Sequence, residues 1–158
     1  MSKIIIMVGI PGSGKTTFAK ELAKQDSYLH LSSDVIRKII ISDNIYKPES
    51  INYHTFKTMN NATIKSLKWG TDVIYDATNL SRKDRKSIIK EVNKLREEGY
   101  AISITAFVMS TPINVCIKRN NERGEDKVPN DVMKRYIEKF TRPTLDEGFD
   151  MIVEMKGE

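Results

Sequence analysis

The sequence is poor in the residues that disulfides and zinc sites require. Cys116 is the only cysteine, so an internal disulfide is excluded and a reducing compartment is expected. The two histidines, His30 and His54, stand alone, and no Cys/His spacing typical of zinc occurs. No apolar run approaches the about 20 residues that a helix needs to cross a membrane. From these absences we expect a cytoplasmic protein without a zinc site.

What the sequence does contain describes a single globular domain over residues 1–158. Charged residues make up 30% and hydrophobic residues 39%, which is typical of a soluble chain that buries a sizeable core. No internal repeat, linker or low-complexity segment divides the chain. The net charge of +5 has two interpretations, an anionic partner or a lysine-rich solvated surface, and charge alone does not separate them.

The stretch Gly-Ile-Pro-Gly-Ser-Gly-Lys-Thr at residues 9–16 matches G-x-x-x-x-G-K-[ST], the phosphate-binding loop. An unbroken apolar run at 4–8 precedes it, as expected of a buried parallel strand, and helical periodicity follows it. Glycine lets successive backbone N–H groups point at phosphate oxygens, and the next helix presents its positive end to the same anion. A chance glycine turn between a strand and a helix is the alternative.

Side chains of this loop add to the backbone cradle. Lys15 would place a mobile charge at the β- and γ-phosphates of ATP, and the Thr16 hydroxyl would ligate Mg²⁺. The residues expected to bind the nucleotide are Gly9, Gly12, Ser13, Gly14, Lys15, Thr16 and Thr17, with Arg119 and Arg123 from a later segment.

Hydrophobic periodicity predicts strands and helices in alternation along the rest of the chain. Strands are expected at 28–32, 72–76, 101–108 and 149–153. Helices are expected at 15–24, from 33, at 51–69, from a capping-box pattern at Ser81 and Asp84 up to Gly99, at 113–120 and from 129. This alternation is typical of the α/β class and predicts a parallel sheet of about five strands with helices on both faces.

Two carboxylates stand at or just after the ends of predicted strands, at the sheet edge where the phosphate loop lies. Ligands bind at this edge in open α/β sheets. A kinase that acts on a hydroxyl needs a carboxylate to accept its proton, and Asp34 is the candidate. A helix N-cap is the alternative role for Asp34. Asp76 ends the third strand like the acid that supports Mg²⁺ in P-loop enzymes, and Thr78 and Asn79 continue that polar edge. A turn or cap is the alternative there.

Arginines accompany these acids. Arg37 follows Asp34 at i+3 on the same helical face, and its guanidinium suits a phosphate through bidentate hydrogen bonds. Arg119 and Arg123 lie four apart and also share a face, and the following Gly124 indicates a lid that closes. A movable arginine stabilises the charge that builds on a transferred phosphate, although a solvated basic helix end is the plainer interpretation of this pair.

Two residues are expected to have packing roles. Cys116 lies on a helix near Ile113 and Ile117, so a small buried hydrophobe is predicted. Trp69, the sole tryptophan, stands near a helix end and is expected to pack and not to stack on a base.

Five segments together resemble the kinase domain of 5′-hydroxyl polynucleotide kinases, and the resemblance covers nearly the whole chain. They are the loop at 9–16, Ser-Asp-Val-Ile-Arg at 33–37, Asp-Ala-Thr-Asn-Leu at 76–80, Lys-Arg-Asn-Asn-Glu-Arg-Gly at 118–124 and Val-Pro-Asn-Asp-Val at 128–132. The later segments look most like phage-type enzymes, whereas Pro-Thr-Leu-Asp-Glu-Gly-Phe at 143–149 looks more like animal and bacterial members. Many kinases share the loop, but the other segments in this order are more specific.

The resemblance implies an adenylate-kinase-like P-loop fold with a helical lid around 119–130. It implies transfer of the γ-phosphate of ATP to 5′-hydroxyl ends of DNA or RNA. In that family's terms Asp34 is the general base on the 5′-hydroxyl, and Arg37 grips the phosphate beside the acceptor nucleoside. The side chains implied at the acceptor are Asp34, Arg37, Asp76, Thr78 and Asn79.

The remaining roles concern the donor nucleotide. The resemblance implies that Lys15 and Thr16 serve the ATP phosphates and Mg²⁺. Asp76 falls at a position that the family uses in its active site, without a fixed role, and its place at the end of a strand makes it a candidate to reach the metal through water. Arg123, with Arg119, would act on the transferred phosphate from the lid. Residues 143–149 would border the adenine.

The sequence departs from the family in two respects. Many members are fused to a phosphatase or ligase domain, and neither is expected here, since no Asp-x-Asp phosphatase motif occurs. Ser33 stands where phage enzymes carry another basic residue, which leaves the acceptor preference open. Two further hypotheses therefore stay open: a small-molecule or nucleotide kinase of the same fold, and a nucleotide-binding regulatory or toxin–antitoxin module. The combination of Asp34 with the arginines disfavours the module, and nothing in the sequence separates DNA from RNA.

Overall fold

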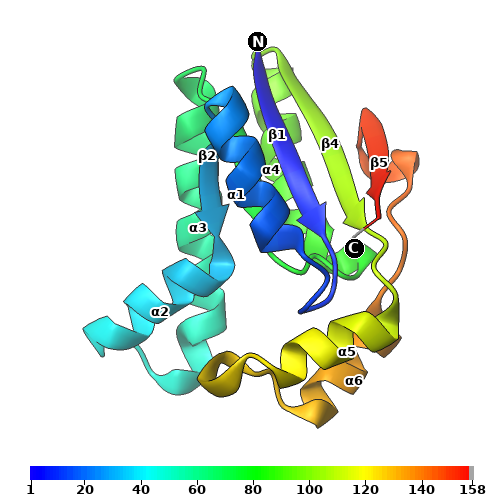
Figure 1. The fold of residues 1–158 in the computed structure, drawn as a ribbon. Coiled ribbons are helices and arrows are strands. Elements are labelled where there is room, and N and C mark those ends of the chain that lie inside the picture. The colour runs from blue at the N-terminus through cyan, green and yellow to red at the C-terminus, as the bar shows by residue number, and fades with distance from the viewer. Residues whose placement is uncertain (157–158) are drawn as a thin grey trace.

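The computed structural model describes residues 1–156, which form a five-stranded parallel sheet with helices on both faces (Figure 1). The strands are β1 (Ser2–Val8), β2 (Leu29–Ser32), β3 (Val73–Asp76), β4 (Ile102–Met109) and β5 (Met151–Met155). They lie in the order β2-β3-β1-β4-β5. The helices are α1 (Lys15–Asp26), α2 (Ser33–Asp43), α3 (Ile51–Lys68), α4 (Arg82–Glu97), α5 (Ile113–Asn121) and α6 (Asn130–Lys139). The 3-10 turns are η1 (Pro48–Ser50), η2 (Gly124–Asp126) and η3 (Leu145–Glu147).

The predicted fold class is confirmed, and most predicted boundaries agree within a residue or two. The capping box of α4 is present, because Asp84 N–H donates to Ser81 Oγ and Ser81 N–H donates to the Asp84 carboxylate. The last strand is predicted at 149–153 and lies two residues later, at Met151–Met155. Phe149 lies before β5 and is buried in the core, while the Asp150 carboxylate accepts the Ile104 N–H at 2.7 Å.

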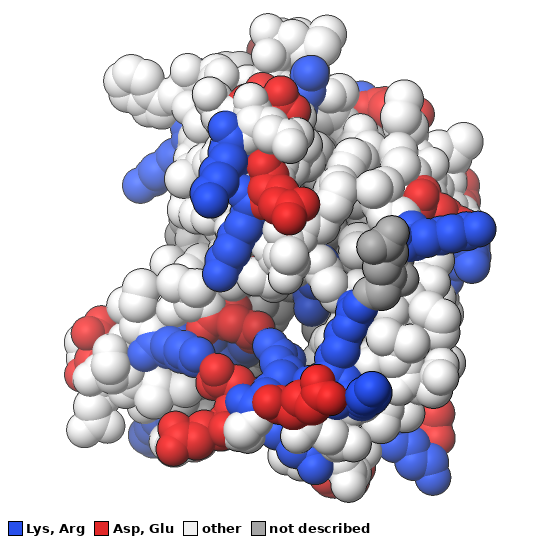
Figure 2. Space-filling view, viewed as in Figure 1, with Lys and Arg blue, Asp and Glu red and all other residues white. Residues whose placement is uncertain are grey.

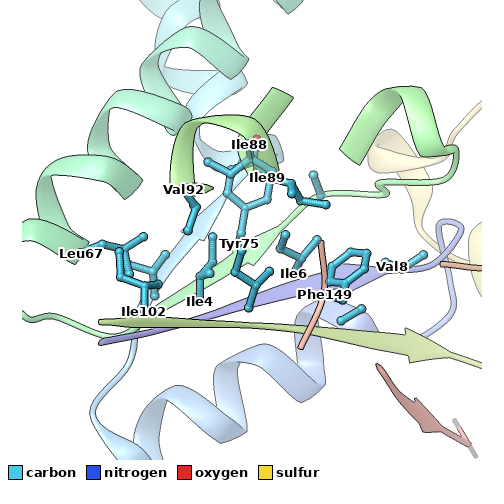
Figure 3. Close-up of a cluster of buried hydrophobic side chains, with 14 of the residues drawn as sticks. Ile4, Ile6, Val8, Leu67, Tyr75, Ile88, Ile89, Val92, Ile102 and Phe149 are labelled. Atoms are coloured by element: carbon cyan, nitrogen blue, oxygen red, sulfur yellow. The ribbon is translucent and has the colours of Figure 1, made fainter. Parts of the chain in front are cut away.

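The central strand β1 is buried on both faces, as its unbroken apolar run predicts. Ile4 and Ile6 point into the larger core cluster, where α3 and α4 cover the sheet (Figure 3). Ile5 and Met7 point to the other face and pack beneath α1, against Ala19. Because β1 is locked in this way, the loop that follows it has a rigid base.

The helical segments that carry the predicted acids and arginines extend past the carboxyl ends of the strands. In Figure 1, α2 with the start of α3 and the α5–α6 pair lie below the arrowheads of β1 and β4. We call α2 with the first turns of α3 the arm, and the segment from α5 through η2 to α6 the lid. The predicted lid residues 119–130 fall at the junction of α5, η2 and α6.

The two packing expectations have opposite outcomes. Cys116 is fully buried, as predicted. Trp69 does not pack, and it is 88% exposed. The reason is periodicity, since the buried face of α3 runs through Met59, Thr63 and Leu67, which leaves position 69 on the outer side. None of the helices in residues 1–156 has the length and apolarity that a membrane span requires.

Candidate active site

The loop between β1 and α1 has the backbone that a phosphate cradle requires. Gly12 and Gly14 have φ values of 84° and 90°, in the left-handed region that favours glycine. A Cβ on Gly12 would also lie 2.4 Å from the Cys116 carbonyl oxygen. Gly14 is the N-cap of α1, so the first N–H groups of that helix open towards the cavity described below. This geometry fits the phosphates of ATP.

Lys15 stands at the first position of α1 and lines the cavity. Burial lowers the pKa of its ammonium group, while the nearby carboxylates of Asp76 and Asp34 raise it and Arg123 lowers it. The charges that act on Lys15 therefore come from the sheet edge, the arm and the lid together. The structure brings these four predicted residues into one electrostatic neighbourhood.

Asp76 is almost fully buried at the end of β3. The Thr16 hydroxyl donates to its Oδ2 at 3.0 Å, and His30 Nε2 lies 2.8 Å from the same oxygen. Mg²⁺ prefers such hard oxygen ligands and is bound by one or two carboxylates with substrate phosphates. Among the described residues no group of three or more His, Cys, Asp or Glu side chains gathers around a metal position. The pair of Thr16 and Asp76 thus fits a Mg²⁺ ion that ATP brings with it.

His30 stands isolated in the sequence, but the fold brings it into contact with Asp76. His30 lies on β2, paired in register with Ile74, so Asp76 is its diagonal neighbour on β3. The register between the two strands is a tertiary feature, which is why the sequence did not reveal the contact. His30 also lines the cavity beside Thr16.

Asp34 does not cap its helix. Ser32 is the N-cap of α2, and its hydroxyl accepts the Val35 N–H at 3.4 Å. Asp34 therefore stands in the first turn with 64% of its side chain exposed. Arg37 donates to the Asp34 carboxylate at 3.1 Å and to Asn52 Oδ1 at 3.2 Å. Asn52 on α3 was not expected from the sequence, and it fixes the Arg37 guanidinium at the edge of the arm.

A cavity of about 960 Å³ lies between the sheet edge, the arm and the lid. Lys15 and Thr16 line it from the loop, Asp34 and Arg37 from the arm, and Arg123 from the lid. Figure 2 shows the molecule hollowed between the sheet and the helices below it, with charges of both signs around the opening. At this opening Lys38 of the arm lies 3.3 Å from the Asp126 carboxylate of the lid.

The two lid arginines differ in position. Arg119 donates to the Gly12 carbonyl at 3.3 Å and so rests on the phosphate loop. Arg123 faces the cavity, and no carboxylate of residues 1–156 forms an ion pair with it. Asn120 between them is buried and exchanges hydrogen bonds with the Val128 backbone at 2.8 and 3.0 Å. Asn120 therefore holds the lid in shape, a role that the sequence did not indicate.

Thr78 and Asn79 lie at the same edge of the sheet but differ in burial and in their hydrogen bonds. Thr78 lines the cavity, and its carbonyl accepts the Gly9 N–H at 3.0 Å. Asn79 is 3% exposed, and its amide donates to the Met7 and Ala77 carbonyls. The amide N–H₂ of Asn79 thus serves the sheet edge. The predicted contact between Asn79 and an acceptor remains a prediction. Because the amide nitrogen is already engaged, such a contact would have to be made by the side-chain oxygen of Asn79.

A buried guanidinium ties the C-terminal part of the chain to this edge. Arg85 is fully buried and forms a two-pronged ion pair with Glu147 at 2.8 and 3.1 Å. It also donates to the Asn79 and Thr141 carbonyls. Residues 143–149 are thereby held against α4, and their predicted place beside the adenine stays a prediction.

Curated relatives and a solved structure show what this geometry is similar to. The chain is 29% identical over 152 residues to the L-seryl-tRNA(Sec) kinase of Methanococcus maripaludis, covering 94% of this chain and 56% of that protein. It is 23% identical over 157 residues to the bifunctional polynucleotide phosphatase/kinase of Schizosaccharomyces pombe, covering 97% of this chain and 33% of that protein. The chain thus spans between a third and just over half the length of these relatives. The crystal structure of a fungal RNA kinase superimposes with a TM-score of 0.68 at 20% identity, over 100% of this chain and 76% of that one.

A family model described as an AAA domain (AAA_33) matches residues 4–143. This range contains the phosphate loop, both acids, the arm and the lid arginines. Because the match covers most of the chain and the five-stranded parallel sheet follows the fold of P-loop kinases, the protein belongs to this AAA domain family and has a P-loop kinase fold.

Proposed function

We propose that this protein is a kinase that transfers the γ-phosphate of ATP to the 5′-hydroxyl end of a DNA or RNA strand. The observation that carries the proposal is the placement of the Asp34–Arg37 pair on the arm, across one cavity from Lys15, Thr16 and Arg123. A base, an anion grip and a phosphate cradle are thus arranged around a space large enough for a nucleotide and an acceptor end.

Each side chain has a chemical task in this proposal. The exposed Asp34 carboxylate accepts the proton of the attacking hydroxyl, and Arg37 both orients Asp34 and binds the phosphate that follows the first nucleoside. Lys15 neutralises charge on the ATP phosphates, and Arg123 approaches the transferred phosphate when the lid closes. Mg²⁺, when bound, would draw charge from the β- and γ-phosphates. Thr16 would ligate it, and Asp76 would reach it through water.

An acceptor carried by nucleic acid is supported by two kinds of observation. Arg37 stands one turn beyond the base, and besides orienting Asp34 its guanidinium suits an acceptor that bears an anion close to its hydroxyl. The names of the two curated relatives describe a kinase for seryl-tRNA(Sec) and a polynucleotide phosphatase/kinase. The L-seryl-tRNA(Sec) kinase favours a second candidate acceptor, the hydroxyl of a serine attached to tRNA.

The test is transfer of labelled phosphate from ATP to a panel of acceptors. We expect transfer to 5′-hydroxyl DNA or RNA oligonucleotides and none to the same strands already phosphorylated at the 5′ end. Seryl-tRNA and a set of small hydroxylated metabolites complete the panel. Asp34→Asn is the control, since it should abolish transfer while preserving nucleotide binding. Transfer to seryl-tRNA or to a metabolite alone would replace the proposed acceptor.

A further inference from the structure

Four lysines on α4 form a basic surface. This helix contains seven basic and three acidic residues, and its three arginines, Arg82, Arg85 and Arg96, pair with carboxylates outside it. Among the described residues, the basic side chains of α4 without an ion pair are therefore its four lysines. Lys83, Lys86, Lys90 and Lys94 follow one another at spacings of three, four and four residues. Residues at these spacings share a helical face. They therefore form a row, which we call the lysine row, on a helix whose opposite face is buried in the core.

The lysine row borders a groove of about 770 Å³ that is separate from the cavity described above. Ile89 and Asn93 line it together with the lysines. Its two carboxylates do little to neutralise the row, because Glu147 is paired with the buried Arg85 and Glu97 lies at the far end of the helix. Within residues 1–156, none of the four lysines takes part in an ion pair.

The groove and the active-site cavity are lined by neighbouring residues in the first turn of α4. Arg82 and Lys83 line the groove, whereas Asp84, the next residue, lines the cavity together with Lys139. Asp84 and Lys139 form an ion pair at 2.9 Å in the lining of the cavity. A polymer whose end lies in the cavity can therefore continue into the groove around the N-terminus of α4.

We propose that the lysine row binds the phosphodiester backbone of the acceptor strand, beyond the nucleotide that receives the phosphate. The proposal rests on the polynucleotide acceptor proposed above. The row extends about 16 Å along the helix at 1.5 Å per residue, a length that a stacked strand covers in about four to five nucleotides. Because the contacts are to phosphates, binding should become tighter as the strand lengthens and should not depend on the base sequence.

The test compares acceptors of two lengths. The ratio of kcat/KM for a single-stranded 5′-hydroxyl 12-mer to that for a dinucleotide is measured for the wild type and for the Lys86→Glu/Lys90→Glu variant. We expect the ratio to fall by about tenfold or more, and the slope of log kcat/KM against log salt for the 12-mer to become shallower by about 1.4. The matched control, Lys65→Glu/Lys68→Glu on the exposed end of α3, makes the same charge change outside both hollows and should keep the wild-type ratio.

A binding measurement separates this proposal from the proposed activity. Fluorescence anisotropy with a 5′-phosphorylated 12-mer, which is no longer an acceptor, should show weaker binding to Lys86→Glu/Lys90→Glu than to the wild type and the control. Equal binding by all three proteins overturns the lysine row as a nucleic-acid site, whatever the activity. Absence of transfer to every 5′-hydroxyl strand overturns the activity instead. Binding to phosphatidylserine vesicles but not to the 12-mer assigns the row to a membrane surface and overturns the proposal.

Discussion

Lys15 is the residue on which the donor site depends most. It is half-buried at the wall of the cavity, where burial lowers the pKa of its ammonium group and Asp76 and Asp34 raise it. We predict that Lys15→Ala lowers kcat/KM by at least about a hundredfold, the scale of one lost charge stabiliser. The thermal unfolding temperature should stay near that of the wild type, because the side chain faces the cavity. Near-wild-type turnover would contradict the assignment of the loop.

His30 is predicted to act through Asp76. Removing its ring in His30→Ala leaves the buried carboxylate with Thr16 as its one side-chain partner among the described residues. A lost hydrogen bond to a charged group costs about 1.5–3 kcal/mol, so we expect kcat to fall by about ten- to a hundredfold. His30→Gln keeps a polar group of similar reach and should recover part of the loss. Equal kcat for wild type and both variants would show that His30 only fills space.

Arg37 provides the comparison that separates the acceptor classes. A bidentate arginine–phosphate contact contributes about 1.5–3 kcal/mol, or about ten- to a hundredfold in binding. A nucleoside 3′-phosphate should therefore be phosphorylated on its 5′-hydroxyl far better than the free nucleoside. Arg37→Ala should erase most of that preference. Equal kcat/KM for the matched pair in the wild type would favour the small-molecule kinase.

At the scale of elements, the lid is expected to act mainly in the transition state. Arg123 lies on a segment that Asn120 holds together from within, so its motion is that of the lid as a unit. We predict that Arg123→Ala lowers kcat by about three orders of magnitude while ATP affinity changes by no more than about threefold. Single-turnover rates and nucleotide titrations measure the two quantities. A collapse of ATP affinity with an unchanged kcat would make Arg123 a contact of the bound nucleotide alone.

The η3 turn is joined to α4 by the buried pair of Arg85 and Glu147. Burial raises the pKa of the Glu147 carboxyl, but hydrogen bonds from Arg85 and the Thr144 N–H outweigh this, so the pKa lies below its ordinary 4.5. A depressed folded-state pKa means that the contribution to stability is complete above pH 4.5 and is lost as the pH falls through the folded value.

Removing this charge should both destabilise the protein and weaken its response to acid. We predict that Glu147→Gln lowers the free energy of unfolding at pH 7 by about 3–5 kcal/mol, because Arg85 is left buried without a counter-charge. Its stability should then fall less steeply than that of the wild type below pH 4.5. Urea unfolding at a series of pH values measures both effects. Glu97→Gln, at the exposed end of α4, is the control and should change neither.

At the scale of the whole molecule, the sequence predicted what repeats along the chain or follows a motif. Alternation of apolar runs predicted the sheet, and the phosphate loop placed Lys15 and Thr16. Strand ends predicted that Asp34 and Asp76 share the carboxyl edge, because parallel strands end together. The N-cap of α2 is Ser32, two positions before Asp34, for which the sequence left a capping role open.

What the sequence did not reveal depends on register and on long-range contacts. The meeting of His30 with Asp76 requires the β2–β3 register, and the pair of Arg37 with Asn52 requires the arm to be folded. From the sequence, Arg85 is one of several charged residues on an amphipathic helix, and nothing local indicates that it is buried with Glu147 as its partner. Local periodicity contains none of this information, because each contact joins positions that the chain brings together only on folding.

The contacts of Arg85 have a consequence for the order of events during synthesis. The Arg85 guanidinium donates hydrogen bonds to the Asn79 carbonyl just after β3 and to the Thr141 carbonyl just after α6. It also pairs with the Glu147 carboxylate in the η3 turn. A nascent chain acquires the last two groups only after its phosphate loop, arm and lid have all been made. The edge of the sheet that borders the cavity is thus completed late. Ribosome-bound chains that end before η3 should bind nucleotide weakly or not at all, and competence should follow release of the finished domain.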